Sequence, residues 1–227
     1  MEFIGQILYL ICIFPFEYIF SLILKVCLMI LPHGYALIMM SLVVNLLTLP
    51  IMSWAKKIEN REREKQFKVK QEVIGVKKQY KGEEAFRKID AVYKKYHYSA
   101  LLAFRADLSI FLSIPIFIAA ITTLDSNPVF AGVSFGPISD LSKPDGLVFG
   151  YNFLPVFMTL VNLFNIKLYN NDNKFFDRAN IKLIILALLF LVYLYGRSSA
   201  LMIYWTSNNI LSGLIIVFGF INKRNNS

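Results

Sequence analysis

Charged residues are scarce in this chain. Only 17% of the residues are Asp, Glu, Lys or Arg, whereas 56% are hydrophobic, and a water-soluble domain of this length carries more charge and fewer apolar side chains. There are only two cysteines. Both Cys12 and Cys27 lie in apolar stretches, where cysteine usually packs as a small hydrophobic residue rather than forming a disulfide or holding a metal. The composition therefore indicates an integral membrane protein.

The chain also lacks the motifs of most enzymes. The strings GVSFG and KGEE do not have the spacing of a phosphate-binding loop. No His, Cys and carboxylate side chains cluster at catalytic spacing, so we expect His33 and His97 to be inert. There is no internal repeat, which a small-solute transporter typically shows, and no cleavable signal peptide. The sequence predicts a protein that is not an enzyme and needs no cofactor or metal.

Positive charge is concentrated in one segment. Fifteen of the 24 Lys and Arg residues lie within residues 55–105, against seven acidic residues, so this segment carries 15 − 7 = +8 of the net charge of +9. Loops rich in Lys and Arg stay in the cytoplasm. Nucleic-acid binding is a weaker explanation, since Glu alternates with Lys and Arg and no recognition motif accompanies them. We therefore expect a cytoplasmic basic domain that recognises no specific nucleic-acid sequence.

Two apolar seams run through this basic segment at helical spacing. The first is Val69, Val73, Val76 and Tyr80, and the second is Phe86, Ile89, Tyr93 and Tyr96. Between them Lys81-Gly82 forms a natural turn. Two such helices predict an antiparallel helical hairpin at 55–104, with two separate solvated helices as the alternative.

Five apolar segments approach the roughly 20 residues that a helix needs to cross a bilayer. They cover residues 35–54, 107–124, 151–169, 181–195 and 200–221. The loop at 126–150 has one Lys against two Asp, a net charge of −1, whereas the region 167–182 has four basic residues against two Asp, a net charge of +2. Since positive loops stay inside, we expect the hairpin, the loop at 170–180 and the C-terminus on the cytoplasmic side of the cell membrane.

The N-terminal segment at 1–33 is apolar but interrupted by Pro15. After the proline, Glu17, Ser21 and Lys25 recur every four residues and form one polar stripe, which suits an interfacial helix or a span packed against others. We favour the interfacial helix. The predicted fold is an all-α integral membrane protein with this N-terminal interfacial helix, a five-helix core bundle and a cytoplasmic antiparallel helical hairpin. Its core spans lie at 34–54 and within 105–227.

Polar residues inside the spans are the candidate functional residues, because a polar group in hydrocarbon needs a partner or water. They are Asn45, Thr48, Arg105, Asn162, Tyr204, Ser207 and Asn208. Such side chains either join helices through hydrogen bonds or line a hydrated cavity. Their presence in four spans favours the cavity. No span has an acidic residue at its centre, which argues against a proton- or cation-coupled transporter.

Three motifs resemble the YidC/Oxa/Alb family of membrane protein insertases. They are YALIMMSLVVNLLTLPIMSWAKK in the first core span, YKKYHYSALLAFRADLSIFLSIPIF at the second, and ALMIYWTSNNILSG, with its Tyr-Trp-x-x-Asn pattern, in the last. The resemblance implies five core helices around a hydrophilic groove that is open to the cytoplasm and the lipid. It also implies a protein that inserts nascent membrane proteins without an energy source. The basic hairpin would then meet the ribosome, a translocase or anionic lipids.

The chain departs from the family pattern at two places. Asn45, five residues before Pro50, stands where the resemblance places a groove arginine. The stretch before Pro115 is longer than usual, lacks the usual Asn-Pro and carries Arg105 and Asp107. We expect Arg105 to be the only cation near the groove. The alternatives are a membrane scaffold or assembly subunit of another complex and, more weakly, a small-solute transporter.

Overall fold

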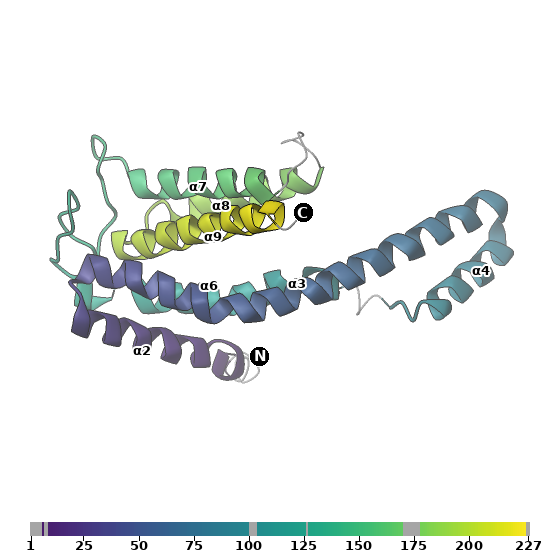
Figure 1. The fold of residues 1–227 in the computed structure, drawn as a ribbon, viewed down its shortest axis with the longest axis horizontal. Coiled ribbons are helices and arrows are strands. Elements are labelled where there is room, and N and C mark those ends of the chain that lie inside the picture. The colour runs from purple at the N-terminus through teal and green to yellow at the C-terminus, as the bar shows by residue number, and fades with distance from the viewer. Residues whose placement is uncertain (1–5, 7–8, 100–103, 126, 170–177, 226–227) are drawn as a thin grey trace. The chain divides into compact units, whose positions relative to one another are not determined.

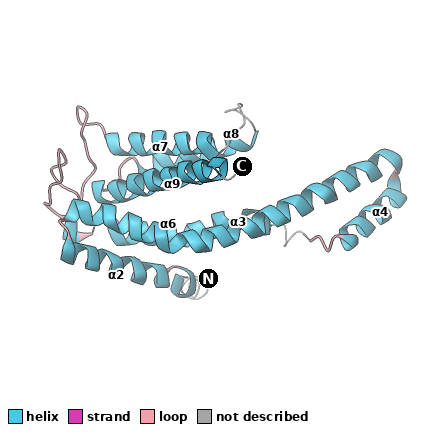
Figure 2. Ribbon diagram, in the orientation of Figure 1, coloured by secondary structure: helices cyan, strands magenta, loops and turns pink. Residues whose placement is uncertain are grey.

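The protein is built from helices joined by loops (Figure 1, Figure 2). The computed structural model describes residue 6 and residues 9–99, 104–125, 127–169 and 178–225. In chain order the elements are α2 (Phe14–Ile30), α3 (His33–Gln79), α4 (Gly82–Lys95), the 3-10 helix η1 (Phe104–Asp107), α6 (Leu108–Leu124), the 3-10 helix η2 (Pro128–Phe130), α7 (Phe153–Tyr169), α8 (Arg178–Leu194) and α9 (Ser199–Asn225). In this described part β-structure is limited to two isolated bridges.

The predicted all-α membrane class is confirmed. Three helices in the described part are long and apolar enough to cross a membrane, namely His33–Gln79, Arg105–Leu124 and Ser199–Val217. Shorter apolar helices, Phe153–Leu168 and Leu183–Leu194, occupy the third and fourth predicted spans. Most of the predicted loop at 170–180 lies outside the described residues, as do residues 100–103 at the end of the predicted hairpin domain.

The chain forms two compact units. The first consists of Met1–Leu47 and Ile116–Ser227, and the second is Thr48–Pro115. The first unit holds the main buried core, to which α2, the beginning of α3, the end of α6, and helices α7 to α9 contribute. The second holds the rest of α3, together with α4, η1 and the beginning of α6.

Helix α2 packs beside the beginning of α3 in the first unit (Figure 1). Pro15 lies in the first turn of α2, where a proline is favoured because its missing N–H would have no helical partner. The buried side of α2 consists of Phe20, Leu24 and Cys27. Ser21 and Lys25 of the polar stripe are exposed. Glu17, the third member of the stripe, is half-buried. Only part of the stripe therefore faces away from the core, and the interfacial position of the segment stays a prediction.

Helix α7 lies side by side with α8 and α9 (Figure 1). Its exposed apolar side chains recur at helical spacing and form a single stripe, Phe153, Val156, Phe157, Leu160 and Phe164. The other side of α7 carries the buried residues Pro155, Met158 and Thr159. Because the helix is apolar on the exposed side as well, it is suited to packing against the bundle on one side and lipid on the other.

Asp125 and the loop at 127–152 are held against the segment that joins α8 to α9 and against the first residue of α9. Arg197 Nη1 donates to Asp125 Oδ2 at 2.9 Å, and the Ser198 backbone N donates to Asp125 Oδ1 at 2.9 Å. The backbone N of Ser199 donates to the carbonyl of Lys143 at 2.7 Å. These bonds satisfy polar groups at the start of α9 and give this end of the first unit a defined shape.

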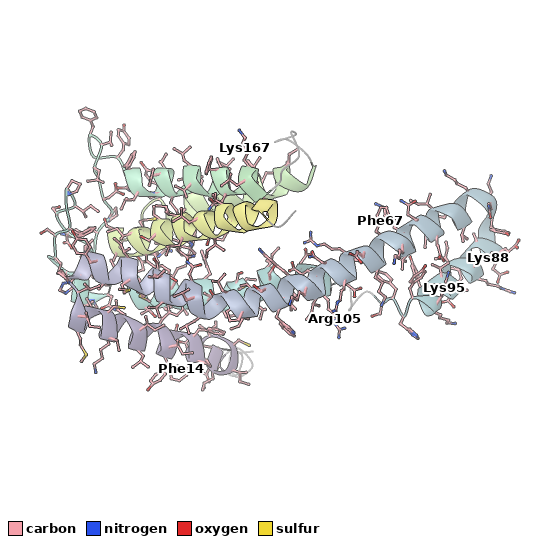
Figure 3. The ribbon with its side chains drawn as sticks, in the orientation of Figure 1. Phe14, Phe67, Lys88, Lys95, Arg105 and Lys167 are labelled. Atoms are coloured by element: carbon pink, nitrogen blue, oxygen red, sulfur yellow. The ribbon has the colours of Figure 1, made fainter. Side chains whose placement is uncertain are left out.

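In the second unit α3 continues through Pro50 to Gln79 as one helix. A proline removes one backbone hydrogen bond, and here the helix continues past it, from the predicted span into the basic segment without a break. Helix α4 then returns beside α3. Lys95 Nζ lies 2.8 Å from Glu72 Oε1, and the Tyr96 hydroxyl donates to the same oxygen at 2.6 Å. Figure 3 shows Lys95 near the end of α4.

The packed side of α4 differs from the predicted second seam. It follows Ala85, Ile89, Val92 and Tyr96, which are buried or half-buried. Phe86 and Tyr93, which belong to the predicted seam, are exposed. Both stripes have helical spacing and share two residues, so periodicity alone does not distinguish them, and a rotation of the helix by less than one residue-to-residue step selects between them.

Candidate functional site

Asn45 joins α3 to α9 inside the first unit. Its exposed fraction is 8%. The side-chain Nδ2 donates to Asn208 Oδ1 and, at 3.4 Å, to the Asn208 carbonyl. The Oδ1 atom of Asn45 accepts from Ser212 Oγ at 3.5 Å. Two residues that the sequence marked as functional candidates, Asn45 and Asn208, are therefore brought together although 163 positions separate them.

A second amide joins α7 to α9. Asn165 Nδ2 donates to the carbonyl of Asn209 at 2.7 Å. Gly213 lies directly against this amide, since a Cβ atom built at 213 would overlap Asn165 Oδ1. A small residue thus lets the two helices approach closely, as is common between membrane helices. We call Asn45, Asn165, Asn208 and Ser212 the amide cluster; α9 contributes two of its members.

The other candidates in the first unit, Asn162, Ser207 and Tyr204, differ in how deeply they are buried. Asn162 and Ser207 are half-buried, and Asn162 lies three residues before Asn165, on the packed side of α7. Tyr204 is only 3% exposed, and its ring packs edge-on against Phe20 with the ring centres 6.0 Å apart. Tyr204 is thus part of the packed core of this unit.

The amide cluster has a distinct chemistry. Each asparagine side chain offers two donor hydrogens and an acceptor oxygen, and serine offers both functions in one hydroxyl. The cluster is uncharged. Asn45 bonds to Asn208 and Ser212 between α3 and α9, whereas Asn165 joins α7 to α9 through the carbonyl of Asn209. Such groups can exchange partners with a peptide amide or another polar side chain without a change of protonation. They cannot attract an anionic group as an arginine would.

Thr48 and Arg105 belong to the second unit. Thr48 is half-buried and Arg105 is exposed. The nearby carboxylate of Asp107 pairs with Arg63, whose Nη2 lies 3.2 Å from Asp107 Oδ1, and Arg63 Nε donates to the carbonyl of Ala106 at 3.0 Å. Arg63 therefore ties the basic part of α3 to η1 by two contacts. That Arg105 and Thr48 belong to a groove stays a prediction.

The second unit contains a buried carboxylate that the sequence pattern did not predict. Glu59 is buried, and its Oε1 accepts from the backbone N of Ser109 at 2.6 Å and from the Ser109 hydroxyl at 2.5 Å. It thereby caps the first turn of α6, where backbone N–H groups have no helical partner. Helical spacing within the basic segment gave no signal for this contact, because the partner is 50 residues away.

The hairpin in the second unit carries opposed charges that perturb each other. A hydrogen bond from Lys95, and a second from Tyr96, hold the pKa of the Glu72 carboxyl below its ordinary value. The same bond to Glu72 raises the pKa of the Lys95 ammonium. Lys88 Nζ lies 3.8 Å from the centre of the Tyr80 ring, and a hydrogen bond to Tyr80 raises the pKa of Lys88. These contacts stabilise the hairpin but leave most of its Lys and Arg side chains to solvent.

Comparison with known proteins adds one match. A family model described as 60Kd inner membrane protein matches residues 26–226, nearly the whole chain. Nothing matches in a search of curated proteins. The matched range includes both Asn45 and Asn208, and therefore the whole amide cluster.

Proposed function

The chain belongs to the family described as 60Kd inner membrane protein, the YidC/Oxa/Alb family of membrane protein insertases, and on that premise we propose how this member works. It takes a polar segment of a client membrane protein into an intramembrane groove around the amide cluster. The apolar helix of the client then passes into lipid. The family's general role is the insertion and chaperoning of nascent membrane proteins; the groove mechanism is our proposal.

The observation that carries the proposal is the meeting of Asn45, Asn208 and Ser212 between two apolar helices. Apolar helices could pack through aliphatic side chains alone. Polar residues at membrane depth are costly unless paired, and they commonly mark a pathway for polar groups. Asn165 extends the same polar region onto α7.

The physical task of an insertase is to lower the barrier for a polar segment. A charged side chain at the centre of a bilayer costs about 2.5–3.5 kcal/mol on insertion scales. A polar groove that reaches partway across shortens the apolar path and offers hydrogen-bond partners along it. The amides of Asn45 and Asn208 can release each other and bind the client, so the exchange itself consumes no nucleotide.

For the orientation we propose the hairpin and the C-terminus on the cytoplasmic side. The net charge of +8 in residues 55–105 supports this, because Lys and Arg near spans are retained in the cytoplasm. The exposed basic side chains of α4 would then be available to the ribosome, a translocase or anionic lipids. Mapping by a membrane-impermeant cysteine reagent tests this orientation, and labelling of the hairpin from the outer side would overturn it.

Water access to the cluster is the direct test of the groove. Single cysteines at 45, 162 and 208 are placed in a chain that carries Cys12→Ser and Cys27→Ala. We expect a small water-soluble thiol reagent to label them faster than a cysteine at Leu160, which lies on the exposed apolar stripe of α7. Equal, slow labelling at all positions would contradict a hydrated groove.

Asn45→Arg tests the charge of the groove. Because the residue is buried beside Asn208, an arginine there would place a cation within the amide cluster. We expect this variant to insert clients with acidic polar segments better than the unmodified chain does, and Asn45→Gln to leave client preference unchanged. The measurement is insertion of a client series that differs only in the charge of the polar segment.

A scaffold function is the second candidate, and the closeness of the helices favours it. Gly213 and Asn165 are in direct contact, and Asn45 already has a partner in Asn208. If the cluster serves only to join helices, the interior is dry and a fixed partner subunit replaces the changing clients. The labelling experiment above distinguishes the two, since only the insertase requires water at 45 and 208.

A further inference from the structure

The loop before α7 ends in a tight turn with exposed apolar side chains. Residues 148–151, which we call the aromatic turn, include Phe149, whose exposed fraction is 98%, and Tyr151, at 69%. Phe149 and Gly150 both have positive φ angles, of 49° and 85°. Two successive positive φ angles are typical of a type I′ turn, in which Asn or Gly is favoured at the first position.

A phenylalanine at that first position is unfavourable in two ways. The left-handed conformation is sterically strained for a bulky residue, and the ring makes almost no contact with the rest of the chain. Within the described residues, no packing of the Phe149 ring offsets the strained backbone or the exposure of the ring. Phe149 therefore suits an interaction with something outside this chain.

The backbone of the turn is paired with itself. The Val148 N donates to the Tyr151 carbonyl at 3.2 Å, and the Tyr151 N donates to the Val148 carbonyl at 2.8 Å. These two bonds pair the backbone groups at both ends of the turn, which lowers the cost of approaching hydrocarbon relative to an open loop, because unpaired N–H and C=O groups are strongly disfavoured there.

Hydrogen bonds also fix the base of the aromatic turn to neighbouring parts of the chain. The backbone N of Phe153, the first residue of α7, donates to Asp145 Oδ2 at 2.6 Å. Asn152 Oδ1 accepts from the Gly146 N at 3.1 Å, and Asn152 Nδ2 donates to the Tyr195 carbonyl at 2.7 Å. The base of the turn is thus fixed to the beginning of α7 and to the end of α8.

The exposed surface of the turn adjoins the exposed stripe of α7. Phe153 lies two residues after Tyr151, and its ring stacks on that of Phe157 with the centres 5.8 Å apart. Leu160 and Phe164 continue the stripe along the helix. In a membrane-embedded helix an exposed apolar stripe meets lipid, and the aromatic turn extends this surface past the first residue of the helix.

We propose that the aromatic turn is a membrane-interface anchor, with the Phe149 ring inserted at the boundary between lipid headgroups and acyl chains beside α7. Apolar side chains such as phenylalanine bury at the boundary between headgroups and acyl chains. Tyrosine is enriched at this depth, and Tyr151 has an apolar ring with a hydroxyl that can remain among the headgroups. The anchor fixes the depth and rotation of α7 in the leaflet. It does not depend on the insertase proposal.

The test is a single fluorescent reporter in the full chain. Trp54→Phe and Trp205→Phe remove the two native tryptophans, and Phe149→Trp introduces the reporter. A matched control carries Ser139→Trp instead, at an exposed polar position of the same loop. Both proteins are reconstituted in vesicles of phosphatidylcholine and phosphatidylglycerol, with or without bromine atoms on the acyl chains near the headgroup.

We expect the emission of the 149 reporter to be blue-shifted relative to the control and to lose intensity in brominated lipid, while aqueous iodide quenches mainly the control. Equal emission and equal iodide quenching at both positions would overturn the proposal. So would a blue shift without bromine quenching, which would indicate contact with a second protein copy.

A second reporter avoids changing Trp205, which packs against Phe117. Phe149→Cys, labelled with an environment-sensitive nitrobenzoxadiazole group in a chain with Cys12→Ser and Cys27→Ala, should give the same pattern of emission and quenching. Agreement between the two reporters supports the anchor, and a water-like signal from this one contradicts it.

Discussion

The pairing of Asn45 with Asn208 can be measured as a coupling energy. In the structure the Asn45 amide donates to the side chain and the carbonyl of Asn208 and accepts from Ser212. Asn45→Ala and Asn208→Ala each remove one partner, and the double variant removes both. A double-mutant cycle therefore isolates the interaction between the two amides.

The magnitude follows from the burial of Asn45 and the partial burial of Asn208. Removing one partner takes away the side-chain bond of the other amide at a buried or half-buried site, which costs about 1–3 kcal/mol. Hydrogen bonds between membrane helices are worth about 0.6–2 kcal/mol. We therefore expect each single variant to lower the free energy of unfolding by about 1–3 kcal/mol, and the double variant to fall short of the sum by about 1 kcal/mol.

The assay is reversible unfolding of the full chain in mixed micelles, followed by circular dichroism. Ser41→Ala serves as the matched control on α3, because the Ser41 hydroxyl donates to the Ile38 carbonyl of its own helix. The control combined with Asn208→Ala should be additive within about 0.5 kcal/mol. Additivity of the same kind for Asn45 and Asn208 would refute the direct pairing.

Three further predictions concern other parts of the chain. Gly213→Ala places a methyl group against the Asn165 amide, so unfolding should become easier by about 1–3 kcal/mol, and Asn165→Ala in the same chain should restore part of the loss in the same assay. Arg105→Ala removes an exposed cation and should impair insertion of clients with acidic polar segments most, as measured with a client series of graded charge. Hydrogen bonds from Ser142, with smaller contributions from neighbouring groups, lower the pKa of Asp140 from 3.8 to about 2; the stability it contributes is complete above its ordinary pKa and is lost as the pH falls toward 2, so thermal unfolding between pH 5 and 2.5 should depend less on pH in Asp140→Asn.

The helices themselves follow closely from the sequence. Apolar length and the alternation of loop charge predict the helical membrane class, since both depend on residues near each other in the chain. The hairpin turn at Gly82 is a similar case, because its φ of 62° is a conformation that glycine adopts without strain. Asn45 and Asn208 were identified as polar residues inside apolar spans, and both also lie in the family motifs.

The contacts between helices could not be predicted from the sequence in the same way. The sequence placed Asn45 and Asn208 in a common site but could not show that they bond directly, because that depends on the rotation of two helices far apart in the chain. The same limit explains why Phe86 was assigned to the packed side of α4 and is exposed. It also explains why Glu59 was not recognised as the cap of α6.

Capture of a client in the act of insertion tests the central claim most directly. A photo-crosslinking amino acid at 208 or 162 is compared with one at Val192, an exposed apolar residue of α8, while a stalled nascent membrane protein is presented to the full chain. We predict crosslinks from 208 and 162 to the polar segment of the client, and few from 192. Crosslinks confined to lipid or to one fixed partner protein at 208 and 162 would contradict the groove mechanism and support the scaffold.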